Sequence, residues 1–128
     1  MAKTVLTDDE QTLRSYLRDR ARLKLLAPYQ DAGAQVGLSM ANPDHRRTLG
    51  QLLGRINQYE VDAGRSMLSA IVVYTGAEDL VGSGFFNYAE SIGRLSRTAS
   101  WDEQQEFHAA EVTKVHDFWS DRRNRLLA

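Results

Sequence analysis

Three segments in the middle of the chain decide the fold. Residues 29–37 read YQDAGAQVG, residues 47–56 read RTLGQLLGRI, and residues 67–73 read MLSAIVV. The first is a short helical pattern closed by glycine, the second repeats apolar residues at helical spacing, and the third is a short apolar run. This order of short helix, turn, amphipathic helix and buried strand is typical of a winged helix-turn-helix. We therefore expect an α+β, mainly α fold with a winged-helix-like core and a small sheet.

The limits of these elements can be predicted from capping and turn residues. Residues 42–44 read Asn-Pro-Asp, which supplies a capping side chain, a proline at the first helical position and an acid in the first turn. The central amphipathic helix should begin there and end at the Asp-Ala-Gly break of residues 62–64. Gly37 closes the short helix over 30–36, in which Gly33 permits close packing. The apolar run then predicts a strand over 67–74.

Two longer helices should flank this core. Thr7 can cap a helix over 7–26, which Pro28 would end and in which the leucines at 23–26 would supply packing surface. Ser100 can cap a second helix over 101–126, where Trp101 and later aromatic residues should be mostly buried. With a winged-helix-like core over 29–90, residues 1–128 form one predicted domain.

Glycines between the strand and the second flanking helix predict a turn or wing. Thr75-Gly76 and Gly82-Ser83-Gly84 bracket this segment. Phe85 and Phe86 follow, and a short helix should end near Gly93. The two phenylalanines either pack the wing against the core or stack on bases of a nucleic acid.

Charge and composition restrict the function classes. The 128 residues include 16 Lys+Arg and 17 Asp+Glu, so the net charge of -1 provides no global attraction to nucleic acid or anionic lipid. Cysteine is absent, which excludes disulfides, thiol nucleophiles and Cys-ligated zinc. No apolar stretch approaches the ~20 residues of a membrane span. We expect a cytoplasmic protein that does not enter membranes.

Polar residues on the central helix and beside it are the candidate binding residues. The helix start and its solvent side should present His45, Arg46, Arg47, Gln51 and Arg55, where a recognition helix carries its contacts. Arginines there could donate to phosphates or base edges. The same charges are also consistent with a solvated helix face balanced by nearby acids. The full candidate set adds one residue before the helix and one in the wing, namely Tyr29 and Ser83.

The central stretch resembles the DNA-binding half of alkylguanine DNA alkyltransferases and of alkyltransferase-like proteins. In that family a Tyr-x-x-x-small-x-x-apolar-Gly helix leads to an Arg-x-apolar-Gly helix. The first pattern is matched from Tyr29 to Gly37, and the second from Arg47 to Gly50. The resemblance implies that Tyr29 lies beside a rotated nucleotide and that Arg47 replaces an extruded base. About a third of the chain is covered.

The family's catalytic motif is not present. Its Pro-Cys-His-Arg-Val-Val segment aligns with residues 68–73, where Ser69 and Ala70 replace the cysteine and histidine. Alkyl transfer needs an activated thiolate, so this chemistry is excluded. Residues 67–86 also resemble a segment of uncharacterised small prokaryotic and phage proteins, usually Leu-Leu-Ser-Ala-Leu-Val-Val followed by Pro-Gly-x-Gly-Phe-Phe. That resemblance implies a bacterial or phage accessory protein.

Catalytic and metal sites are disfavoured by residue spacing. His108, Glu111 and His116 share part of a helix face, but the histidines lie about two turns apart, too far to close on one ion. Ser69 has no histidine nearby in sequence to act as a base, and the acids are too scattered for a nuclease site. We predict no enzyme activity, no metal and no cofactor.

Two functions remain open at this stage. The first is a non-enzymatic prokaryotic or phage accessory protein that binds DNA or RNA through a winged helix-turn-helix. The alternative is a protein-binding inhibitor or adaptor, of phage origin and acting on a host enzyme, that uses the same surface. The near-neutral charge favours the alternative, because dedicated DNA binders are usually more basic. An apolar edge of the last helix is also compatible with a homodimer.

Overall fold

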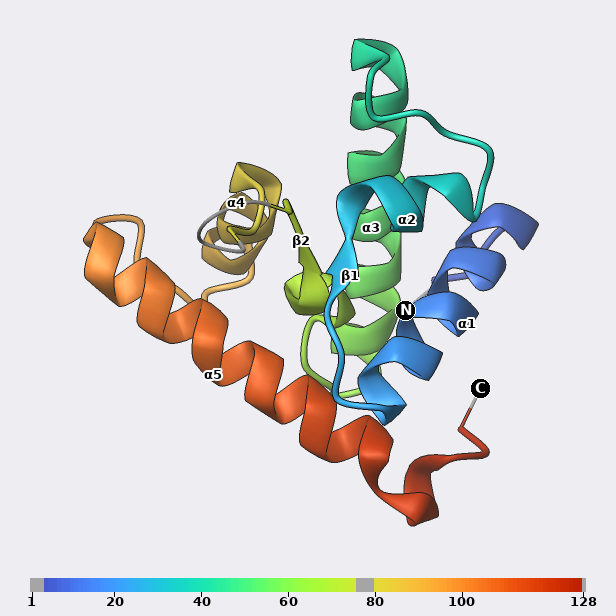
Figure 1. The fold of residues 1–128 in the computed structure, drawn as a ribbon. Coiled ribbons are helices and arrows are strands. Elements are labelled where there is room, and N and C mark those ends of the chain that lie inside the picture. The colour runs from blue at the N-terminus through green and yellow to red at the C-terminus, as the bar shows by residue number, and fades with distance from the viewer. Residues whose placement is uncertain (1–3, 76–79, 128) are drawn as a thin grey trace.

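The computed structural model describes residues 4–75 and 80–127 and is mainly helical (Figure 1). The elements in chain order are α1 (Asp8–Arg22), β1 (Ala27–Pro28), α2 (Tyr29–Ala34), α3 (Pro43–Asp62), the 3₁₀ helix η1 (Leu68–Ile71), β2 (Val72–Val73), α4 (Ser83–Ser91), α5 (Trp101–Ser120) and the 3₁₀ helix η2 (Arg122–Asn124). The predicted α+β, mainly α class is confirmed. No helix within the described ranges is long and apolar enough to cross a membrane.

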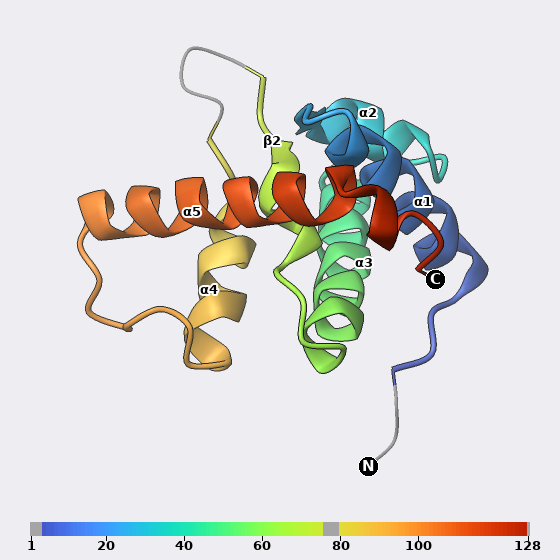
Figure 2. The same cartoon turned by 90° about the horizontal axis from the view of Figure 1, so that it is seen from below.

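The short helix η1 is the centre of the hydrophobic core. All four of its residues are buried, and it packs against α1, α3 and α5. Figures 1 and 2 show α5 crossing one side of the molecule, with α1 beside its carboxyl end. Leu13 and Leu17 of α1 and Trp119 of α5 belong to the same buried cluster as η1. The flanking helices therefore complete the core around the central segment.

The predicted small sheet is present, but its strands are short. β1 and β2 pair in parallel, with Ala27 opposite Val72 and Pro28 opposite Val73. The strand predicted over 67–74 is wrong in extent, because residues 68–71 form η1. There the Asn57 side chain of α3 accepts a hydrogen bond from the Ser69 amide at 3.1 Å, satisfying a buried donor that a strand would have to pair.

The three predicted helix starts are confirmed. Thr7 and Ser100 each form a capping box with the glutamate three residues later. The Asn42 side chain accepts hydrogen bonds from the amides of Asp44 and His45, and Pro43 occupies the first turn of α3. These starts are marked by side chains that bond within the first turn of each helix.

The predicted ends of both flanking helices were too late. α1 ends at Arg22 instead of residue 26, because Lys24 adopts a φ of 56° and the Leu25 amide bonds back to the Arg20 carbonyl. Leu23 and Leu25 are consequently exposed, against the predicted packing role. α5 ends at Ser120 instead of residue 126. The next residue, Asp121, has an extended backbone conformation, and its side chain caps η2.

Two further predictions near the second flanking helix need correction. Trp101 was expected to be mostly buried but is 61% exposed, because the amino end of α5 extends past the core beside α4 (Figure 1). Ser83 and Gly84 were assigned to the predicted wing, yet they form the first turn of α4. Residues 76–79 of that wing lie outside the described residues. Phe85 and Phe86 are both buried and meet edge to face.

Candidate functional site

A cleft of about 210 Å³ lies among α2, α3, η1 and the start of α4. The side of α3 is lined by Arg46, Gly50 and Gly54, and the side of α4 by Gly82 and Ser83. Segments from four parts of the chain therefore meet at one hollow. This is the place where most of the polar and aromatic features of the central segment come together.

Two glycines open the cleft along α3. A Cβ atom built at Gly50 or at Gly54 would meet nothing within 4 Å. Glycine inside a helix costs roughly 0.5–1 kcal/mol relative to alanine. Both glycines therefore reduce the stability of α3 and leave a smooth strip of backbone, one helical turn long, that faces the cleft.

A stacked pair of tyrosines forms an aromatic part of the cleft lining. The Tyr29 and Tyr74 rings lie 4.3 Å apart, 27° from parallel. Tyr29 is held by the Gly82 amide, which donates to its hydroxyl oxygen at 3.1 Å. Burial raises the pKa of Tyr29, and this hydrogen bond opposes the increase. A Cβ atom at Gly82 would lie 2.7 Å from the Tyr29 hydroxyl oxygen, so only glycine permits this approach.

The amino end of α4 points its first amides toward the same region. Gly82 is the N-cap residue, and within the described structure no side chain caps this helix. Ser83 and Gly84 follow, and both line the cleft. Uncapped amides and the positive end of the helix dipole favour negative groups. The cleft thus combines aromatic rings, a guanidinium and partly positive amides.

A buried polar pair lies deeper in the cleft. The Asn57 side-chain amide donates to the Ser69 hydroxyl oxygen at 2.7 Å and accepts from the Ser69 backbone amide. Both residues are almost fully buried. Their mutual bonds join α3 to η1. This pair holds the two elements that carry opposite parts of the cleft.

The seven predicted binding residues fall into three groups. Tyr29, Arg46 and Ser83 line the cleft together. Arg47 and Gln51 lie on the exposed outer face of α3. Arg47 Nη1 is 3.5 Å from a carboxylate oxygen of Asp44. The structure therefore places Arg46, and not Arg47, in the same cleft lining as Tyr29.

The other two predicted residues, His45 and Arg55, form hydrogen bonds that stabilise the fold. The His45 ring accepts a hydrogen bond from the Ser39 amide at 3.0 Å, which fixes the turn before α3. Arg55 donates to Glu10 and to the Val5 carbonyl, away from the cleft. Neither contact was visible in the sequence, because each depends on how distant or irregular segments fold back.

Several cleft residues were not identified from the sequence. Tyr74, Tyr88 and Asn57 line the cleft but were assigned no binding role. The Gly-x-x-x-Gly spacing of Gly50 and Gly54 was the available signal, since residues four apart lie on one helix face. No comparable signal connects Tyr74 to Tyr29, which lies 45 positions earlier.

The histidines of α5 bond to backbone carbonyl groups. His108 Nε2 lies 2.7 Å from the Ala70 oxygen, and His116 Nε2 lies 3.0 Å from the Leu25 oxygen. Across residues 4–75 and 80–127, no three His, Asp or Glu residues are grouped closely enough to hold a metal ion. The two imidazoles therefore help to attach α5 to η1 and to the segment after α1.

Comparisons with known proteins add no relative. No protein-family model, curated protein or solved structure matches this chain.

Proposed function

We propose that this protein binds nucleic acid through the exposed amino-terminal half of α3 and the cleft beside it. The observation that carries the proposal is the meeting at one hollow of Arg46, the Tyr29–Tyr74 stack and the first turn of α4, which no described side chain caps. Nucleotides combine a negative phosphate with a flat aromatic base, and these are the groups that such a lining recognises. The net charge of the protein does not attract nucleic acid, so the attraction would come from the positive groups at this surface.

The two arginines have different roles in this proposal. Arg46 binds a nucleotide at the cleft, and its guanidinium is oriented by a 2.8 Å hydrogen bond to the Met40 carbonyl. Arg47 contacts backbone phosphate from the outer face of α3, as in a winged helix-turn-helix. Ser69 has a structural role without catalysis.

The test is fluorescence anisotropy with short single- and double-stranded DNA and RNA. Wild type is compared at low and physiological salt with Arg46→Ala, Arg47→Ala and the double variant. Arg122→Ala is the matched control, because it removes one exposed arginine from η2, outside this surface. We expect salt-sensitive binding that both single variants weaken and the double variant abolishes. Absence of binding at low salt, or equal loss in Arg122→Ala, would refute the proposal.

A protein-binding adaptor is the second candidate, favoured by exposed apolar side chains near the cleft. Tyr74 is 50% exposed and Leu80 is 39% exposed, and the Tyr74 amide donates to the Leu80 carbonyl. An interface built on these side chains should tolerate added salt, unlike phosphate contacts. Salt-resistant capture of a partner that is lost in Tyr74→Ser, together with no nucleic-acid binding, would support this candidate.

A further inference from the structure

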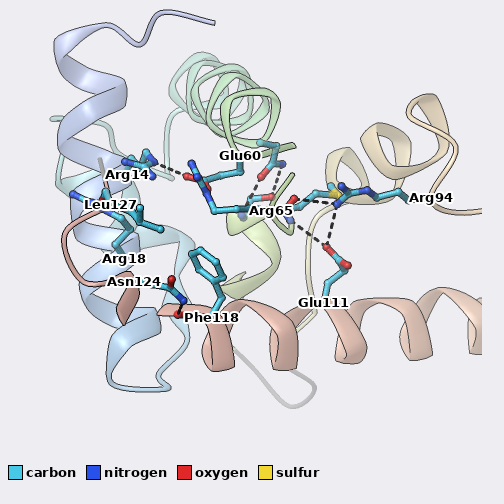
Figure 3. Close-up of polar contacts among 12 residues, drawn as sticks. Arg14, Arg18, Glu60, Arg65, Arg94, Glu111, Phe118, Asn124 and Leu127 are labelled. Carbon is cyan, nitrogen blue, oxygen red and sulfur yellow. Dashed lines mark hydrogen bonds and ion pairs between the residues drawn. The ribbon is translucent and has the colours of Figure 1, made fainter. Parts of the chain in front are cut away.

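A cluster of three arginines lies near the carboxyl-terminal end of α3. Arg14 and Arg18 extend from α1, and Arg65 follows α3; we call these three residues the arginine cluster. Figure 3 shows Arg14 and Arg65 converging on Glu60, with Arg18 close by on α1. Arg14 Nε lies 2.5 Å from a Glu60 carboxylate oxygen.

The cluster contains more positive charge than its acidic partner can neutralise. Glu60 is fully buried and supplies one negative charge to three guanidinium groups. The hydrogen bonds of Arg18 are with neutral groups, the Leu127 carbonyl and the Ser15 hydroxyl. Asp19 also acts electrostatically on Arg18, but it forms an ion pair with Arg22. Burial, followed by the charge of Arg14, lowers the pKa of Arg18. Two positive charges thus remain without a local counter-charge from Glu60.

Two guanidinium nitrogens of the cluster also lack hydrogen-bond partners. Arg14 Nη2 and Arg18 Nε are buried, and in the described part of the chain neither has an acceptor. Arg14 as a whole is only 5% exposed. Buried polar groups are almost always paired, and an unpaired donor costs about 1–3 kcal/mol. A ligand that supplies acceptors would remove this cost.

A hollow of about 500 Å³ lies beside these groups. Its lining includes Arg14 and Arg18, with the polar side chains of Gln11 and Ser15. Among the described residues, no acid lines it. It shares no lining residue with the cleft between α3 and α4. The hollow therefore offers only cations and neutral hydrogen-bonding groups to a ligand.

We propose that this hollow is a binding site for a small anion that carries a phosphate group, held by Arg14 and Arg18. A phosphate monoester carries about -1.5 to -2 charges at pH 7, which matches the two charges that Glu60 leaves unbalanced. Its oxygens accept paired N–H bonds from guanidinium groups. The site is independent of nucleic-acid binding at the cleft.

Trp119 provides a direct reporter of occupancy. Its ring is 3% exposed, and the guanidinium carbons of Arg14, Arg18 and Arg65 lie 5.5–5.7 Å from its centroid. The other tryptophan, Trp101, is exposed at the far end of α5. In a Trp101→Phe background, a change in fluorescence therefore reports on the arginine cluster.

The experiment titrates inorganic phosphate, pyrophosphate or citrate at constant ionic strength and follows fluorescence and Tm. We expect phosphate or pyrophosphate to raise Tm and change fluorescence saturably, and Arg18→Gln to weaken binding about tenfold or more. Arg97→Gln, which removes an exposed arginine outside the hollow, should bind as wild type does. Arg46→Ala/Arg47→Ala should also keep the response, which separates this site from the cleft.

Three results would overturn the proposal. They are no saturable response to phosphate or pyrophosphate, an unchanged affinity in Arg18→Gln, or a response to citrate alone, which would assign the hollow to carboxylates. If Arg18→Gln does not fold, Arg18→Lys replaces it, because lysine keeps the charge but not the forked donors. Undiminished phosphate affinity in Arg18→Lys would then overturn the role of the guanidinium.

Discussion

The two halves of α3 are built for different purposes. If Gly54 is taken as the boundary, the amino-terminal part carries exposed arginines and the open glycines Gly50 and Gly54, whereas the carboxyl-terminal part buries Ile56, Asn57 and Glu60. The first half has local polar contacts, and the second is joined to α1, η1 and Arg65. One helix thus serves as an anchor at one end and, in the proposed function, as a binding surface at the other.

Breaking the anchor should have the largest effect. Glu60→Gln removes the charge that balances Arg14 and Arg65, and unpairing a buried ion pair typically costs about 3–5 kcal/mol. Asp44→Asn makes the same change at the exposed end, next to Arg47, and should cost no more than about 1 kcal/mol. Urea unfolding of both variants measures the difference. Equal losses would contradict the division of α3 into an anchor and a surface.

A substitution at Asn57, near the boundary between the two parts of α3, should reduce the free energy of unfolding by an intermediate amount. Asn57→Ala deletes both side-chain hydrogen bonds to Ser69 and leaves the buried Ser69 amide without its acceptor. We expect a loss of about 1–3 kcal/mol in the free energy of unfolding. Chemical denaturation provides the measurement, and Gln58→Ala, on the exposed side of the same turn, is the control. A loss no larger than that of the control would show that the pair is not structural.

A substitution in the amino-terminal part of α3 should raise the stability of the protein instead of lowering it. Gly54→Ala should stabilise the protein by about 0.5–1 kcal/mol, because alanine favours the helix and its Cβ atom meets nothing within 4 Å. The same methyl group enters the cleft and should weaken nucleic-acid binding. Thermal unfolding and anisotropy on one sample measure both effects. Unchanged binding in a stabilised variant would remove this part of the cleft from the proposed site.

High pH should reduce the stability of the folded protein through ionisation of Tyr29, a residue of the cleft. Its pKa is raised in the folded protein, mainly by burial, so the folded state retains the phenolic proton more strongly. The associated stability is complete below the unfolded pKa of about 10 and is lost as pH rises through the folded pKa. Urea midpoints measured across this range should fall less steeply in Tyr29→Phe. An identical slope in both proteins would show that burial of this hydroxyl has no energetic consequence.

Helix starts were predictable from the sequence because they depend on a few adjacent residues. Thr7, Asn42 and Ser100 cap through side chains that bond within the next turn. The ends of helices were harder, because Lys24 adopts a left-handed conformation that neither its side chain nor its neighbours require. The 3₁₀ form of residues 68–71 likewise depends on Asn57, a residue of another helix.

The candidate site could likewise be predicted only in part, because it depends on residues that are distant in sequence. The sequence identified Tyr29, Arg46 and Ser83, but nothing in their spacing indicated that they share one cleft. Gly82 was interpreted as part of a turn or wing, whereas its amide donates a hydrogen bond to the Tyr29 hydroxyl oxygen. Contacts between residues about fifty positions apart arise from packing, which a pattern within one segment does not encode.

The pairing of α1 with α5 also affects how the protein is made. α1 leaves the ribosome roughly a hundred residues before the part of α5 around Val115 that packs against the same core, a delay of about 5–20 s at ordinary translation rates. During this interval the side chains of Leu13 and Leu17 lack part of their final cover. Synthesis of α5 is therefore the step that closes the hydrophobic surface of the nascent chain.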